Sequence, residues 1–120
     1  MEVTLILNGG IKSCCSVTPA ETIEKAVREW IGQNNRLLVV DVTRDAWEPD
    51  SVTSLAYQHF QDEIFPLTYL DGRLARLGEL PGRDHLLAML DGSMPYGIGE
   101  EDILHAALRR EEELVEAEGE

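Results

Sequence analysis

Apolar residues follow two different periods along the chain, and each period predicts one type of element. Residues 3–7 (VTLIL) and 37–42 (LLVVDV) are short, nearly continuous apolar runs, a pattern typical of buried strands. Between them, helical spacing predicts a helix that begins near Thr18 and ends at Gly32, with an apolar face of Ile23, Ala26, Val27, Trp30 and Ile31. The first 42 residues therefore predict a strand, helix, strand unit with parallel strands.

A hairpin is predicted further along the chain. Residues 67–70 and 73–77 are strand-like and are separated by Asp71-Gly72, which is a strong signal for a two-residue turn between antiparallel strands. Pro66 directly precedes the first of these strands, where a missing N–H group is tolerated.

Two more helices are predicted on either side of this hairpin. Asp50 or Ser51 can cap a helix whose apolar face consists of Val52, Leu55, Ala56 and Phe60. His59 lies beside that face and is expected to be a partly buried packing residue, because no second histidine or cysteine stands at ligand spacing. Residues 84–90 predict a third helix.

The end of the chain differs in composition from the rest. A linker rich in glycine, proline and serine, residues 93–99, separates a domain of residues 1–92 from an acidic amphipathic helix at 100–120. The first half of this helix is expected to dock on the domain, and its last turns are expected to fray. Its nine acidic residues against two arginines are interpreted as a solvated helix face, with a site for a basic partner as the alternative.

The overall composition narrows the functional classes. A chain of 120 residues with 43% hydrophobic content can form a globular core without disulfide support. The formal net charge of −13 argues against nucleic-acid and anionic membrane partners. No apolar run approaches the length of a membrane span, and the N-terminus lacks the pattern of a signal peptide. A cytoplasmic location is therefore expected.

The residues with the most chemical potential lie between the first strand and the first helix. Cys14 and Cys15, the only cysteines, follow a glycine-rich start in the segment NGGIKSCCSVTPAET. Thr18 is the expected N-cap, Pro19 the first helical residue, and Glu21 the partner that completes a capping box. Thiols within about one turn of a helix N-terminus lie near its positive dipole end, which favours the thiolate.

The adjacency of the two cysteines limits their chemistry. Consecutive Cα atoms are about 3.8 Å apart, whereas disulfides usually need about 4.4–6.8 Å, so a bond between Cys14 and Cys15 would be strained and easily reduced. Two neighbouring thiolates can still converge on one soft ion. Three interpretations stay open: ligands for a soft metal or metalloid, a labile redox pair, or two inert buried residues.

The order of predicted elements resembles the thioredoxin fold over about residues 1–92. The shared features are strand, helix, strand, helix, hairpin and helix, thiols after the first strand, and a proline before the third strand. The resemblance implies an α/β protein with a four-stranded mixed sheet flanked by helices, to which this chain adds a C-terminal helix. It also implies that Pro66 is cis and faces Cys14 and Cys15.

Within that fold, the chain resembles the arsenic metallochaperones of the ArsD family. The matching segments are Cys14-Cys15-Ser16, Pro66-Leu67 and Leu70-Asp71-Gly72. This resemblance implies that Cys14 and Cys15 bind trivalent arsenic or antimony. The family has a third cysteine five residues after the pair, where this chain has Ala20, so a small thiol, solvent or a second subunit would complete the site.

Two other functions remain open at this level. The same thiols would serve a redox protein or sensor that forms a labile disulfide or a mixed disulfide with glutathione, with Cys14, Cys15 and Pro66 as its catalytic residues. The chain would otherwise be a non-catalytic interaction domain that binds a protein acceptor or a second copy. None of the three requires a resident cofactor.

Overall fold

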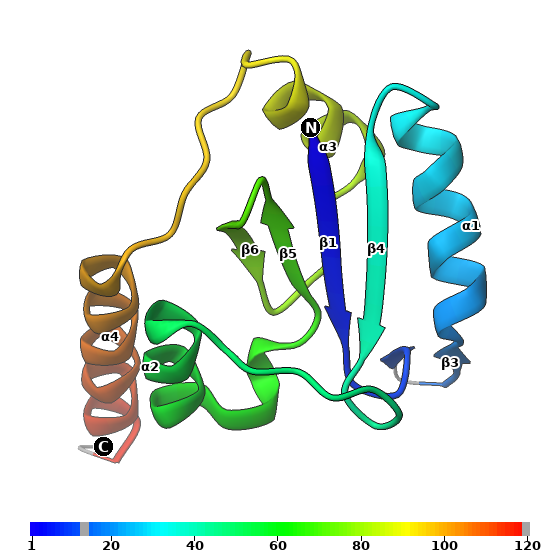
Figure 1. Ribbon diagram of the computed structural model, residues 1–120. Coiled ribbons are helices and arrows are strands. Elements are labelled where there is room, and N and C mark those ends of the chain that lie inside the picture. The colour runs from blue at the N-terminus through cyan, green and yellow to red at the C-terminus, as the bar shows by residue number, and fades with distance from the viewer. Residues whose placement is uncertain (13–14, 119–120) are drawn as a thin grey trace.

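The computed structural model describes residues 1–12 and 15–118 (Figure 1). The elements in chain order are β1 (Glu2–Leu7), β2 (Ile11–Lys12), β3 (Val17–Thr18), α1 (Ala20–Ile31), β4 (Arg36–Asp41), α2 (Ser51–Phe60), the 3-10 helix η1 (Gln61–Ile64), β5 (Leu67–Leu70), β6 (Arg73–Leu77), α3 (Arg83–Leu90) and α4 (Glu100–Glu118). The mixed α/β class and the order of the four sheet strands and the four α-helices agree with the prediction, whereas β2, β3 and η1 were not predicted.

A four-stranded mixed sheet in the order β4-β1-β5-β6 forms the centre of the molecule (Figure 1). β1 is parallel to β4 and antiparallel to β5, and β5 is antiparallel to β6. The predicted parallel unit and the predicted hairpin are therefore both confirmed. Asp71 and Gly72 have φ angles of 48° and 82° at the hairpin turn, the left-handed conformations that such a two-residue turn requires.

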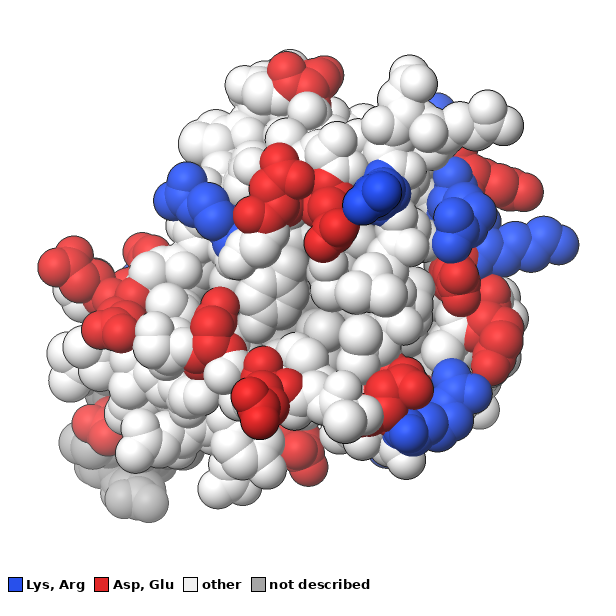
Figure 2. All heavy atoms as spheres, viewed as in Figure 1, with Lys and Arg blue, Asp and Glu red and all other residues white. Residues whose placement is uncertain are grey.

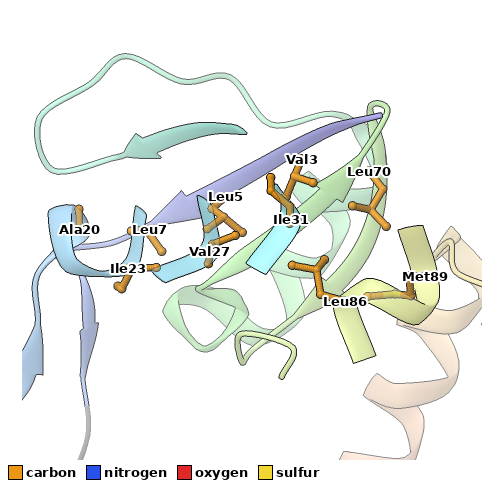
Figure 3. Packing of buried hydrophobic residues seen from close by; sticks show 10 residues of the cluster. All are labelled: Val3, Leu5, Leu7, Ala20, Ile23, Val27, Ile31, Leu70, Leu86 and Met89. Atoms are coloured by element: carbon orange, nitrogen blue, oxygen red, sulfur yellow. The ribbon is translucent and has the colours of Figure 1, made fainter. Parts of the chain in front are cut away.

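Helices cover both faces of the sheet because the side chains of β1 alternate between two cores. Val3, Leu5 and Leu7 pack with α1 and α3 on one face, as Figure 3 shows for the labelled side chains. Ile6 packs on the opposite face, in a cluster that also includes Ala56 of α2. Burial of both faces explains why this strand is an almost uninterrupted apolar run.

The position of β4 differs from its prediction as a buried strand. It lies at the edge of the sheet, and Leu38 is 52% exposed. An apolar run does not indicate whether a strand is central or at an edge, because Leu37 and Val39 still face the α1 core while their neighbours face the other side.

The start of α1 also differs from the prediction. Thr18 belongs to β3, where it pairs with Ile11, and the helix begins at Ala20 with Pro19 as an N-cap that makes no side-chain capping bond. Glu21 does not complete a capping box. Hydrogen bonds from its own backbone N–H and from Arg44 instead lower the pKa of Glu21.

The C-terminal helix docks on the domain as predicted. α4 packs against α2, with Ile103 buried in the second core. Arg110 donates to both carboxylate oxygens of Glu63, at 2.6 and 3.0 Å.

His59 is exposed, so its predicted partial burial is wrong. In the described part of the chain, no helix combines the length and apolar character needed to cross a membrane.

A buried hydroxyl pair offers a test of the core around α2. The side-chain hydroxyls of Thr53 and Tyr69 are hydrogen-bonded to each other, and burial raises the pKa of Tyr69. Tyr69→Phe should lower the free energy of unfolding by about 1–2 kcal/mol in urea titrations, because Thr53 loses its partner. Adding Thr53→Val should restore most of the loss. A double variant less stable than Tyr69→Phe would contradict this account.

Candidate functional site

The cysteine-bearing loop begins where β1 ends at the carboxyl edge of the sheet. Gly9 and Gly10 have φ angles of 76° and 82°, which glycine adopts at little cost. A Cβ atom on Gly10 would also collide with the carbonyl oxygen of Thr18. Glycine at this position therefore lets the two ends of the loop approach each other.

A small two-stranded ladder closes the loop. β2 and β3 pair antiparallel, with Ile11 opposite Thr18 and Lys12 opposite Val17. The segment between them carries both cysteines. Cys15 is exposed, which places it within reach of dissolved ligands, whereas the predicted ligand Cys14 lies outside the described residues.

Asp41 holds the base of this loop in place, a role that was not predicted from the sequence. Its Oδ1 accepts hydrogen bonds from the backbone N–H of Gly9 at 3.0 Å, the N–H of Thr43 at 3.0 Å and the hydroxyl of Thr43 at 2.6 Å. The side chain lies at the carboxyl end of β4 and is almost fully buried. The loop after β1 is thus fixed to the loop after β4 by one carboxylate.

The hydrogen bonds of Asp41 favour its charged form. Burial would raise the pKa of Asp41, but the hydrogen bonds from Thr43 and Gly9, together with the nearby Arg44, outweigh it and lower the pKa below its ordinary value. The available signal in the sequence was an acidic residue near the end of the apolar run LLVVDV. An acid in such a place needs hydrogen-bond donors to offset its burial.

Pro66 lies across a hollow from the start of the cysteine loop. The peptide bond between Phe65 and Pro66 is cis, as predicted. The hollow has a volume of about 470 Å³ and is lined by Asn8, Gly10, Ile11, Lys12, Asp62, Glu63, Phe65, Pro66, Gly78, Glu79 and Leu80. Pro66 therefore faces the described part of the loop, up to Lys12. Its predicted approach to the thiols themselves stays a prediction.

Comparisons with known proteins add no family to this description. No protein family model matches the chain. No curated protein and no solved structure matches it either.

Two of the four charged residues that line the hollow form ion pairs with arginines. The charged residues of the lining are Lys12, Asp62, Glu63 and Glu79. Arg110 is bonded to Glu63, and the hydrogen bond from Arg110 lowers the pKa of Glu63, while Arg76 is paired with Glu79. On the face seen in Figure 2, acidic side chains are widely spread and basic side chains lie among them. The hollow does not concentrate one sign of charge.

The position that would supply a third thiolate is inside the core. Ala20 is 6% exposed and packs with the α1 cluster. Across residues 1–12 and 15–118, no group of three or more histidine, cysteine or acidic side chains is arranged to hold a metal ion.

Proposed function

We propose that the chain is a small thioredoxin-like thiol protein that captures a soft metal or metalloid ion, such as trivalent arsenic or antimony, between Cys14 and Cys15. The observation that carries the proposal is the exposure of Cys15 on a loop whose described base borders a hollow opposite cis-Pro66. An exposed thiol on an anchored loop can reach an ion in solution, which a buried, inert cysteine could not.

The arrangement of elements supports the thioredoxin-like assignment. In the sheet order β4-β1-β5-β6, the parallel pair of the strand, helix, strand unit is extended by the antiparallel hairpin on the β1 side. α1 and α3 pack on one face and α2 on the other. The cis bond before β5 stands where the resemblance places it.

Capture of arsenite by the pair is a ligand exchange. Each thiol gives its proton to a hydroxide of arsenous acid, so two As–S bonds form, two As–O bonds break and two waters leave. A hydroxide remains on arsenic, and a small thiol such as glutathione replaces it with release of a third water. This stepwise exchange suits a protein that receives the ion from, and passes it to, other thiols.

Intact-mass spectrometry of the fully reduced protein with stoichiometric arsenite tests the proposal. We expect one arsenic adduct per chain in which both thiols resist alkylation, because both sulfurs are bound to the same ion. The protein without arsenite, alkylated in the same way, is the control and should gain two alkyl groups. Two outcomes together would refute capture: no arsenic adduct in the mass spectrum, and alkylation of both thiols in the presence of arsenite.

Thiol-disulfide exchange is the second candidate function. The hollow beside cis-Pro66 could accommodate a thiol-bearing peptide next to the cysteine loop. In this case one thiolate attacks glutathione disulfide, one glutathione thiolate leaves, and a mixed disulfide remains on the protein. Redox chemistry predicts that one cysteine matters far more than the other, whereas chelation requires both.

A further inference from the structure

The two edges of the central sheet are protected to very different degrees. At the β6 edge, the N–H of Ile98 donates to the carbonyl of Leu74 at 2.8 Å, and the pairing of β5 with β6 contains an irregularity between Thr68 and Tyr69. Covering segments and bulges are common ways to protect a sheet edge from another strand. In the described part of the chain the β4 edge has neither a covering segment nor a bulge, and its sequence RLLVVD contains no proline or lysine.

Alternate residues of β4 leave their backbone groups pointing away from the sheet. Arg36 N–H donates to Met1 and Val42 N–H donates to Leu7, so even-numbered residues face β1. The backbone N–H and C=O groups of Leu37 and Val39 therefore point away from β1, toward the open edge of the sheet, while their side chains face the α1 core. Within the described residues, no hydrogen bond joins their N–H or C=O groups to the rest of the chain. Asp41, the next outward residue, already bonds to the loop that follows it.

We infer that the β4 edge pairs antiparallel with the β4 edge of a second copy, joining two sheets about a two-fold axis. Only one register pairs both Leu37 and Val39 with residues of the second copy without using Asp41 or residues outside β4. In this register Leu37 pairs with Val39 of the second copy, and Val39 pairs with Leu37 of the second copy. Each pair exchanges both backbone hydrogen bonds. An antiparallel arrangement also closes the assembly, as a symmetric dimer requires.

The side chains fit this register. Leu38 is 52% exposed and would lie directly opposite Leu38 of the second copy, in a pair whose Cα atoms are about 4.5 Å apart. Burial of this leucine on both chains removes apolar surface from water. The apolar residues Leu37 and Val39 would be cross-strand neighbours, an arrangement that stabilises paired strands.

Charge complementarity also favours a second copy. In this register Arg36 lies opposite Val40 of the other chain. Val40 lines a hollow of about 240 Å³ together with Glu48 and Asp50. The arginine of each chain would therefore approach the acidic side chains of the other, and the interaction occurs twice by symmetry. This offsets part of the repulsion between two chains of net charge −13.

The inferred dimer keeps the two thiol loops apart. Both loops lie at the carboxyl ends of their strands, and antiparallel pairing centred on Leu38 points these ends in opposite directions. At about 3.3 Å per residue, the two copies of Asp41 are roughly 20 Å apart. A second subunit bound in this way does not supply the missing third sulfur, so the dimer and metalloid capture can be tested separately.

Site-specific cross-linking tests the register in a Cys14→Ser, Cys15→Ser background. Leu38→Cys should form a disulfide-linked dimer with diamide at least about tenfold faster than Arg36→Cys, because only residue 38 faces its own copy at a distance that a disulfide can span. Residue 36 lies on the same exposed face and is the matched control. Equal rates, faster cross-linking at residue 36, or none at either position would overturn the inference.

Sedimentation of the unmodified protein over a concentration series provides a second test that needs no cross-link. We expect a reversible monomer–dimer equilibrium that Leu38→Glu weakens at least about tenfold, because like charges then lie opposite each other. Leu108→Glu on α4, where the leucine is 57% exposed, should leave the equilibrium unchanged. A protein that stays monomeric throughout, or a dimer equally sensitive to both substitutions, would overturn the inference.

Discussion

Replacing either Cys14 or Cys15 by serine is expected to weaken arsenite binding by about 100- to 10,000-fold. The first As–S bond brings the ion to the loop, and the second forms at the high effective concentration of an adjacent group, which commonly contributes this factor. A serine hydroxyl does not replace a thiolate as a ligand for a soft ion. The two single variants should therefore lose similar amounts of affinity, and the double variant, which has no thiol, should show no arsenite binding.

Competition titrations with a dithiol chelator, followed by intact mass, would measure this loss. Val17→Ser is a matched control, because it places a hydroxyl on an exposed residue of the same loop region and keeps both thiols. Its affinity should equal that of the unmodified protein. Retention of full affinity by one of the two cysteine variants would exclude chelation and favour the single-thiol redox function.

Asp41→Ala should lower the free energy of unfolding by about 2–4 kcal/mol. The substitution removes the acceptor shared by the N–H of Gly9 and both donors of Thr43, and each of these three hydrogen bonds contributes about 0.5–1.5 kcal/mol. Asp41→Asn keeps an acceptor oxygen at the same position and should lose less than half as much. Urea unfolding of both variants at neutral pH measures the difference.

The difference in stability between the unmodified protein and Asp41→Asn is expected to depend on pH. The hydrogen bonds lower the pKa of folded Asp41 below its ordinary value of 3.8, so the charged form stabilises the fold fully above that value. This stabilisation is lost as pH falls from about 3.8 through the pKa of the folded state. The stability advantage over Asp41→Asn should therefore shrink on acidification. An advantage that stays constant down to pH 2 would contradict the assigned hydrogen bonds.

Local patterns predicted most of the elements because their causes are local. Asp50 caps α2 by accepting from the N–H of Thr53 at 2.8 Å, which requires only neighbouring residues. The turn at Asp71-Gly72 depends on two residues that tolerate positive φ. The cis bond at Pro66 was expected from the resemblance in the order of elements, not from its immediate neighbours.

The candidate site was only partly predictable. Its thiols and Pro66 are visible in the sequence, but the anchoring role of Asp41 is not, because its bond to Gly9 joins residues 32 positions apart. The failed capping prediction has a similar origin. Thr18 has a good capping side chain, yet the ladder with Ile11 places it in a strand, and such pairing depends on how the whole loop closes.

The sequence by itself determined the four strands of the main sheet, the four α-helices, the hairpin and the position of the two cysteines, because hydrophobic period and turn chemistry act over a few residues. The tertiary structure alone decided that β4 is an edge strand, that Ala20 is buried in the core and that Pro66 shares a hollow with the loop after β1. These features depend on which distant segments become neighbours. That outcome is set by packing over the whole molecule, where many weak contacts act together.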